Sequence, residues 1–239
     1  CRNQIRKAQK FSPQGKVVVA GCYAQMEADK IKAMQGVDLI LGTHEKHKVF
    51  EFLEQEEEVQ VHIDKTNEFW GAATTEVDTH TRAFLKIQDG CNYVCSFCII
   101  PFARGRSRTI TVKNAIEEAR NLVSKGFKEI VLTGVNIGEY ESTSGERLVD
   151  LVKGILEVEG LKRLRLSSVE PNTITKELLE TLKASIKYQD HFHIPMQSGS
   201  DRILSSMRRK YDVYQYRGII SLVKEYFPDA SIGADIIAG

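Results

Sequence analysis

Short apolar runs alternate with helical patterns over residues 16–55. The runs Lys16–Gly21 and Val37–Gly42 are continuous and end in Gly, which is typical of buried parallel strands. Apolar residues recur at helical spacing over about Ala24–Met34 and again over 45–55. This strand–helix–strand–helix order predicts part of a small α/β domain.

The pattern weakens between Glu54 and Arg82. This stretch begins with the acidic run "EQEEE" and continues with polar residues that have no steady period. We expect an edge strand and a linker here. The Glu run is typical of a solvated face.

A regular β–α pattern then fills the rest of the chain. Helical patterns separate the strands; in the first of them, Thr111 is expected to be the N-cap and Gly126 the stop. The repeated units predict a parallel sheet that curls towards a barrel, which is partial because a complete eight-fold barrel needs about 250 residues. The expected strands are Ala83–Gln88, Glu129–Val135, Leu161–Val169, His191–Ser198 and Ser231–Gly239.

Polar or Gly-rich departures from this pattern follow the carboxyl ends of four successive strands. They are the cysteine-rich stretch after Gln88, then "TGVN", "SSVEP" and "PMQSGS". Parallel α/β barrels carry their chemistry at this end of the strands. The sequence therefore predicts a site there.

The composition limits the class of protein. Hydrophobic residues make up 42% and charged residues 27% of the chain, and the net charge of +1 excludes a strongly basic nucleic-acid coat while permitting a local basic patch. No apolar run approaches the roughly 20 residues of a membrane span, and the first residues lack a signal-peptide core. Five cysteines without a secretory signal favour a reducing, cytoplasmic compartment. The missing initiator Met and the closing strand are typical of a fragment.

Three of the cysteines, Cys91, Cys95 and Cys98, form a compact triplet. A structural zinc site normally needs four ligands in two pairs, and Cys1 and Cys22 lie about seventy residues or more upstream. A [4Fe–4S] cluster normally takes four thiolates, so three would leave one iron open to a small molecule. A zinc-stabilised, non-catalytic RNA-binding barrel remains the alternative from another class.

The spacing Cys91-x-x-x-Cys95-x-Phe97-Cys98 resembles the signature of the radical S-adenosylmethionine (SAM) enzymes. The resemblance implies that SAM chelates the open iron, that reduction of the cluster generates a 5′-deoxyadenosyl radical, and that Phe97 packs on the adenine. It also implies SAM-binding roles for residues at the later strand ends. These are Thr133, Gly134, Asn136, Glu170, Gln197 and Ser198.

Two of these later residues also have an ordinary structural interpretation. Gly134 is typical of a turn, and a lone Glu170 at a strand end is more often a surface or capping residue. His191 and His193 alternate on one side of a strand without a carboxylate partner, so core or supporting roles are expected for them rather than metal binding.

Two groups of arginines are expected on the same face of the barrel, where a polyanionic substrate would approach. Charge runs are usually only solvated, and the resemblance is what favours RNA contacts here. The group members are Arg104, Arg106, Arg108, Arg208 and Arg209.

Nearly the whole chain resembles the radical-SAM methylthiotransferases, through "KVVVAGCYAQ", "GCNYVCSFCIIPFARG", "LTGVNIGEY", "RLSSVEP", "HIPMQSGSDRILSSMRRKY" and "GADIIAG". The resemblance implies an N-terminal methylthiotransferase part with linker at 1–75 and a radical-SAM core at 76–239. It also implies a second, auxiliary [4Fe–4S] cluster, for which Cys22 matches one ligand. The other two ligands would lie upstream of Cys1. Cys1 itself resembles an extra cysteine of one subgroup rather than a ligand. The resemblance also implies an RNA-binding domain after the core.

The motifs are most similar to the subgroup that modifies N6-threonylcarbamoyladenosine beside the tRNA anticodon. The implied reaction adds a methylthio group to C2, with SAM as both methyl donor and radical source. Isopentenyladenosine in tRNA and an aspartate of a ribosomal protein are the alternative substrates. The implied partners are the tRNA anticodon loop, SAM and an electron donor; a cytoplasmic monomer with no membrane association is expected.

Overall fold

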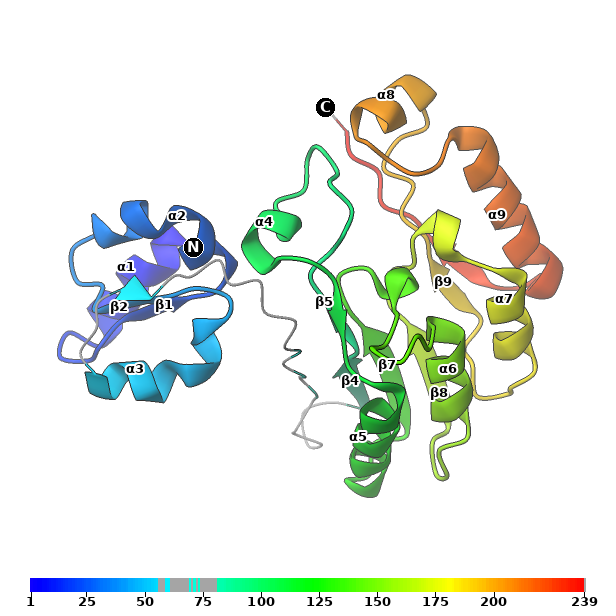
Figure 1. The fold of residues 1–239 in the computed structure, drawn as a ribbon, viewed down its shortest axis with the longest axis horizontal. Helices are drawn as coiled ribbons and strands as arrows, with labels where there is room; N and C mark the ends of the chain where they lie inside the picture. Colours follow the sequence, from blue (N-terminus) through cyan, green and yellow to red (C-terminus); the bar gives the residue numbers. More distant parts are fainter. Residues whose placement is uncertain (56–58, 61–68, 70, 72, 74–80, 239) are drawn as a thin grey trace. The chain divides into compact units, whose positions relative to one another are not determined.

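The computed structural model describes residues 1–55, 59–60, 69, 71, 73 and 81–238, which pack into two compact units (Figure 1). The N-terminal unit comprises Cys1–Thr66 together with Cys98–Arg106, and the C-terminal unit comprises Asn67–Phe97 together with Ser107–Gly239. Among the described residues, no helix is both long and apolar enough to cross a membrane.

The N-terminal unit is built on a parallel sheet with the order β1-β2-β3. In this sheet Val18 lies opposite Leu39, and Ile40 lies opposite Val59. A small core that includes Ile31 and Ile40 fills the space between the sheet and the helices. The elements of this unit are α1 (Arg2–Phe11), β1 (Val18–Ala20), α2 (Cys22–Lys32), β2 (Leu39–Leu41), η1 (Glu45–Lys48), α3 (Val49–Gln55), β3 (Val59–Gln60) and α4 (Ile100–Arg104).

The predicted α/β pattern of this unit is confirmed, and the structure adds the helices α1 and α4 to it. The sequence analysis did not predict α1, because this helix is strongly polar and its apolar face consists only of Ile5, Ala8 and Phe11, of which Ile5 is buried. The expected edge strand is β3, which pairs with β2 at the end of the sheet. The expected linker lies outside the described residues. The segment Cys98–Arg106 packs with this unit through α4, which contacts α2.

The C-terminal unit contains parallel strands at the predicted places. β7 pairs with β4 and with β8, so that Leu132 lies opposite both Leu85 and Leu166. A parallel bridge between Leu164 and Tyr188 leads to the next pair, β9 and β10. The bounds are β4 (Arg82–Lys86), β7 (Glu129–Thr133), β8 (Arg163–Leu166), β9 (His191–His193) and β10 (Ser231–Gly233).

Helices lie along the outer side of this curved sheet (Figure 1). The predicted N-cap is confirmed, since Thr111 Oγ1 accepts a hydrogen bond from Asn114 N at 3.2 Å, and Gly126 ends the turn with a φ of 105°. A continuous core joins helices and strands, with Leu85, Ile130 and Leu164 fully buried. The helices are α5 (Val112–Ser124), η2 (Ile137–Glu139), α6 (Leu148–Leu156), η3 (Pro171–Thr173), α7 (Lys176–Lys183), α8 (Asp201–Ser206) and α9 (Val213–Tyr226).

The last two strands are shorter than predicted. His191–Ser198 was expected to be extended throughout, but β9 ends at His193 and the chain turns at Gln197, whose φ is 63°. The final expected strand ends at Gly233. The apolar run misleads here because buried loop residues such as Ile194 have the same composition as strand residues. The partial barrel itself is confirmed.

Candidate functional site

Gln88 joins the loop after β4 to the loop after β7. It belongs to the short strand β5 (Gln88–Asp89) and is 0% exposed. Its Oε1 accepts hydrogen bonds from Val135 N at 2.8 Å and Asn136 N at 2.9 Å. Its Nε2 donates to Gly90 O at 2.7 Å and to Ser107 Oγ at 2.9 Å. One side chain thus ties both ends of the cysteine loop to the end of β7.

A buried ion pair closes the base of the same loop. Strand β5 pairs antiparallel with β6 (Arg108–Thr109), which brings Asp89 opposite Arg108. Asp89 Oδ2 lies 3.0 Å from Arg108 Nη2 and 2.8 Å from Lys86 Nζ. Burial raises the pKa of the Asp89 carboxyl, but the two cations and the N–H of Gly90 outweigh it and lower that pKa to about 2. The carboxylate therefore stays charged inside the protein.

The three predicted cluster cysteines follow this base. Cys95 is buried, and Cys91 and Cys98 are half-buried. Burial raises the pKa of the Cys91 thiol, and the N–H of Tyr93, 3.3 Å from the sulfur, opposes that rise. Cys91 and Cys95 belong to the C-terminal unit, whereas Cys98 opens the segment that packs with the N-terminal unit.

Within the described part of the chain, no three His, Cys, Asp or Glu side chains are grouped closely enough to hold a metal ion. Because Cys98 belongs to a different unit from Cys91 and Cys95, this statement applies to each unit by itself.

Tyr93 anchors the loop between the first two cysteines. The side chain of this buried residue accepts a hydrogen bond at its hydroxyl from Asn172 Nδ2 at 2.7 Å. Lys210 Nζ lies 3.6 Å from the centroid of the Tyr93 ring and 3.8 Å from Glu139 Oε1. Burial raises the pKa of Glu139 above its ordinary value, although Lys210 opposes this. Side chains that follow β7, β8 and α8 thus meet around the loop.

The end of β7 presents a buried amide. Asn136 is 4% exposed, and its side chain interacts with the Cys91 thiol, which lowers the pKa of that thiol against the larger effect of burial. A Cβ atom on Gly134 would lie 2.8 Å from Ile137 Cγ2 and 2.9 Å from Gln88 Oε1, so a larger residue there would displace one of these side chains. Thr133, the last residue of β7, is half-buried. The buried Asn136 amide therefore lies beside one of the predicted cluster ligands.

Glu170, after β8, forms an ion pair with Arg209, whose Nη1 also donates to Cys95 Sγ at 3.2 Å. Burial opposes the charged form of Arg209, but Glu170 raises the pKa of Arg209 above its ordinary value. Ser167 Oγ, also after β8, is a buried polar atom without a partner in the described chain. The structure thus brings predicted residues from two strand ends together at a cysteine.

The residues after β9 are held by the chain near its described end. Gln197 N donates to Asp235 O at 2.8 Å, and Ile237 N donates to Gln197 O at 2.9 Å. Gln197 and Ser198 are half-buried. His193 Nδ1 lies 2.7 Å from Ser168 Oγ, and His193 Nε2 lies 3.4 Å from Asp235 Oδ1. Burial lowers the pKa of His191. These contacts fit supporting roles for the histidines.

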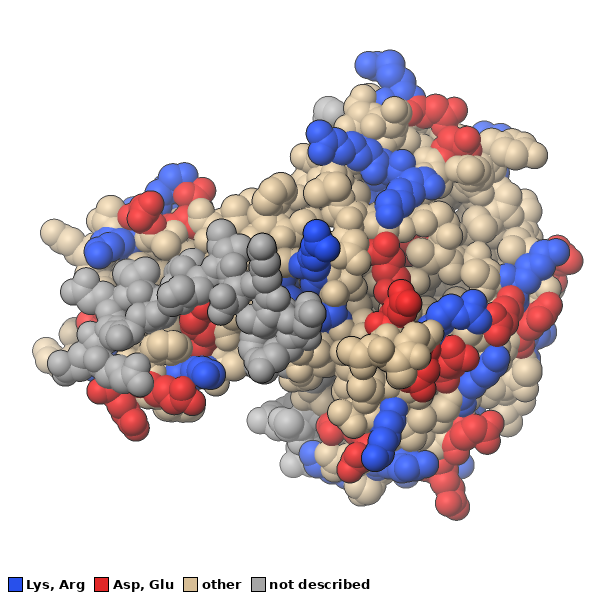
Figure 2. Space-filling model, viewed as in Figure 1, with Lys and Arg blue, Asp and Glu red and all other residues tan. Residues whose placement is uncertain are grey.

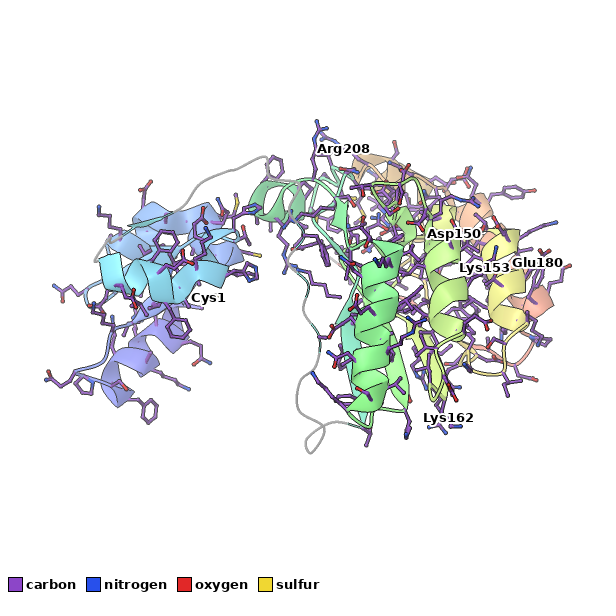
Figure 3. The ribbon with its side chains drawn as sticks, turned by 60° about the horizontal axis from the view of Figure 1, so that its bottom comes forward. Cys1, Asp150, Lys153, Lys162, Glu180 and Arg208 are labelled. Atoms are coloured by element: carbon purple, nitrogen blue, oxygen red, sulfur yellow. The ribbon has the colours of Figure 1, made fainter. Side chains whose placement is uncertain are left out.

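The five predicted RNA-binding arginines have different surroundings. Arg106 and Arg208 are exposed, and Arg208 points away from the C-terminal unit at the end opposite Lys162 (Figure 3). Lys and Arg side chains gather over the α8 region on the face shown in Figure 2. Arg108 and Arg209 have side chains only 4% and 3% exposed, and both form internal ion pairs. This corrects the prediction that they face RNA.

In the N-terminal unit, Arg104 Nε donates to Cys22 Sγ at 3.3 Å. Cys22 is the first residue of α2 and follows Gly21, whose φ of 101° favours Gly. Arg104 thus contacts the cysteine predicted for the auxiliary cluster. In the C-terminal unit, the ring of Phe97 is exposed, as a stacking surface for a ligand would be.

The donor set of the cysteine loop fits an iron–sulfur cluster. Thiolates are the usual ligands of such clusters, and an arginine already donates to one of the sulfurs. Asn136, beside Cys91, and the buried Ser167 Oγ lie at strand ends predicted to bind SAM. This set of groups fits a charged, polar cofactor at the carboxyl end of the sheet.

Several residues of the site were missed from the sequence. Gln88 and Asp89 are polar residues directly after an apolar strand, which is a signal that could have found them. Tyr93, Asn172 and Glu139 meet only through the tertiary fold, and no spacing in the sequence indicates their contacts.

A family model described as the radical SAM superfamily matches residues 85–239. The chain is 39% identical to the threonylcarbamoyladenosine tRNA methylthiotransferase MtaB of Bacillus subtilis (strain 168), covering 100% of this chain and 54% of that protein. It is 36% identical to the MtaB of Aquifex aeolicus (strain VF5), covering 100% and 60%. It is 34% identical to the tRNA-2-methylthio-N(6)-dimethylallyladenosine synthase of Desulfotalea psychrophila, covering 99% and 56%. The chain therefore spans a little over half the length of these curated relatives, and the resemblance inferred from its motifs is confirmed.

Two solved structures share the fold. The cobalamin-dependent SAM radical enzyme OxsB matches with a TM-score of 0.64 at 14% identity, covering 98% of this chain and 38% of that chain. The radical SAM methyltransferase TsrM from Kitasatospora setae matches with a TM-score of 0.54 at 18% identity, covering 65% and 31%. At these identities the likeness extends to the fold alone.

Proposed function

Because the chain belongs to the radical SAM superfamily, we propose that the full-length protein is a tRNA methylthiotransferase. Its substrate is N6-threonylcarbamoyladenosine beside the anticodon, which receives a methylthio group at C2. The observation that carries this proposal is similarity over the whole chain to two proteins named for that activity. The cysteine loop at the end of the first barrel strand supports the same chemistry.

In the proposed site, Cys91, Cys95 and Cys98 hold a [4Fe–4S] cluster. With SAM bound, the cluster supplies a radical that removes a hydrogen atom from a carbon with no acidic proton. The protein's task is then to position the substrate and exclude water. Gln88 fixes both ends of the cysteine loop, and the ordered backbone around Tyr93 presents the thiols.

SAM is proposed to contact the ends of successive strands. Asn136 offers a buried amide to the polar end of SAM. Glu170 uses Oε2 for Arg209 and is proposed to bind the ribose hydroxyls through its other oxygen. Phe97 is proposed to stack on the adenine. Thr133, Gly134, Gln197 and Ser198 complete the proposed set.

The N-terminal part, residues 1–75, is proposed to contribute Cys22 to an auxiliary [4Fe–4S] cluster; residues 76–239 form the radical-SAM core. Arg106 and Arg208 are the exposed arginines proposed to contact tRNA, whose backbone attracts cations. An electron donor is the further proposed partner. We propose a cytoplasmic monomer.

The test is mass spectrometry of tRNA nucleosides from a strain that lacks the full-length gene. We expect loss of 2-methylthio-N6-threonylcarbamoyladenosine, restored by the wild-type gene but not by Cys95→Ala. Cys1→Ala is the matched control, because Cys1 is exposed at the start of α1, and it should restore the product. Unchanged nucleosides in the deletion strain would contradict the proposed tRNA substrate.

A second candidate is the dimethylallyladenosine modification, since several relatives of that name are 34–35% identical over 99% of this chain. Loss of the methylthiolated isopentenyl nucleoside in the same experiment would favour it and leave the chemistry unchanged. A zinc-stabilised RNA-binding barrel predicts a protein with zinc and without labile sulfide after anaerobic reconstitution. Iron and sulfide analysis separates these readings.

A further inference from the structure

Arg209 makes three contacts with one guanidinium group. Nη1 donates to Cys95 Sγ at 3.2 Å, and Nη2 forms the ion pair with Glu170. Nε lies 3.3 Å from the hydroxyl oxygen of Tyr211. With only 3% of its side chain exposed, Arg209 is enclosed by these partners rather than directed towards solvent.

A local turn directs this side chain inward. Arg208 has a φ of 58°, and its N–H donates to Ser205 O, while the N–H of Arg209 donates to Leu204 O, both at 2.9 Å. The reversal leaves Arg208 outside and Arg209 inside, as the exposed position of Arg208 in Figure 3 shows. Two adjacent arginines therefore have opposite environments.

The partners of Arg209 are themselves fixed. The hydroxyl of Tyr211 lies 2.8 Å from Pro195 O and 3.0 Å from Met196 O, at the turn after β9. The cysteine loop is also attached to this region, because Ser96 N donates to Met207 O at 3.1 Å. Such a preorganised fork can bind a sulfur without losing much rotamer freedom.

A cationic N–H donor at a cluster sulfur stabilises negative charge on that sulfur. A one-electron reduction adds negative charge to the cluster, so this contact favours the reduced state, and hydrogen bonds to the sulfurs are known to set cluster potentials. We infer that Arg209 is a positioning residue that orients Cys95 as a cluster ligand, links it to Glu170 and raises the reduction potential of the cluster. This inference rests on the cluster assignment in the proposed function.

The test compares Arg209→Gln and Arg209→Lys in the full-length protein, reconstituted anaerobically. Iron and acid-labile sulfide report cluster assembly, and a titration with a chemical reductant, followed by electron paramagnetic resonance, gives the midpoint potential. We expect Arg209→Gln to lower the equilibrium constant for reduction about tenfold, which is about 59 mV for a one-electron couple. Arg209→Lys keeps the charge but loses the fork, so a smaller shift is expected.

Arg208→Gln is the matched control, because it removes the same charge one residue away from an exposed position. Its potential should equal that of the wild type. An unchanged potential in an Arg209→Gln protein with a full cluster would overturn the inference, as would an equal shift in Arg208→Gln. If Arg209→Gln fails to assemble the cluster, Arg209→Lys decides between the outcomes by its potential.

The nucleoside assay keeps this inference separate from the proposed function. If the wild-type protein binds the cluster and modifies tRNA, but the potential does not change when Arg209 is replaced, the inference about Arg209 is wrong and the proposed function stands. A wild-type protein without iron and sulfide removes the cluster assignment, and the inference falls with it.

Discussion

Replacing Gln88 with Leu tests whether one buried amide holds the cysteine loop and the loop after β7 together. The substitution keeps a side chain of similar volume but removes both hydrogen-bonding groups. The N–H groups of Val135 and Asn136 then lose their acceptor, and Gly90 O and Ser107 Oγ lose their donor.

The magnitude follows from which of these groups water can reach. Val135 and Ser107 are half-buried, so water can replace their lost partner. Asn136 and Gly90 are buried, and each buried group left unpaired costs about 1–3 kcal/mol. We therefore expect Gln88→Leu to lower the free energy of unfolding by about 2–6 kcal/mol, a large part of the roughly 5–15 kcal/mol of a typical domain.

The assay is urea unfolding of the metal-free protein, combined with hydrogen exchange of the Val135 and Asn136 amides. Both amides should exchange faster in Gln88→Leu, because they open without global unfolding. Asn114→Leu on the exposed surface of α5 is the control for adding an apolar side chain in place of an amide, and it should change stability by less than about 0.5 kcal/mol. A Gln88→Leu protein within 1 kcal/mol of wild type, with the two amides still protected, would refute the reasoning.

Two further predictions concern the same loops. The pKa of Asp89 is about 2 in the folded protein and about 3.9 in the unfolded chain, so the Asp89 carboxylate contributes roughly 2.5 kcal/mol to the free energy of unfolding above pH 4. This contribution is lost as the pH falls towards 2. Urea unfolding at several pH values should show a flatter pH dependence of stability in Asp89→Asn, whereas the exposed Asp229→Asn should keep the wild-type dependence. Gly134→Ala places a methyl group 2.8 Å from Ile137 Cγ2 and should lower the free energy of unfolding by about 1–3 kcal/mol, as measured by thermal unfolding. Gly218→Ala in α9, where nothing lies within 4 Å, should raise it by about 0.5–1 kcal/mol. Equal effects of the two substitutions would contradict the steric argument.

The barrel could be predicted because its periodicity is strong at the level of each element. Strand β7 appears as a continuous apolar run, and α5 has helical spacing with Thr111 at its start. The limits of β9 could not be predicted, because the end of a strand depends on pairing with β10, which lies about forty residues later. Helix α1 was missed because its apolar face is reduced to Ile5, Ala8 and Phe11 in a strongly polar segment, a signal too weak to be noticed beside the longer apolar patterns.

The candidate site was only partly predictable for a related reason. Cysteines carry their chemistry in the sequence, so Cys91, Cys95 and Cys98 could be selected by type and spacing. An arginine carries no such information, since Arg208 and Arg209 are identical and adjacent in the sequence but differ in burial and partners. The difference arises from the positive φ at Arg208, which the sequence does not reveal because Arg rarely adopts it.

The structure separates the groups that close the cysteine loop from those that face its sulfurs. Gln88 and the Asp89–Arg108 pair close the loop at its base, where β5 meets β6. Closing a loop costs entropy, and the contacts at its base offset that cost. Arg209 instead contacts the sulfur of Cys95. Substitutions at the base should therefore change the free energy of unfolding before any cofactor binds, whereas Arg209 variants that still assemble the cluster should change its potential.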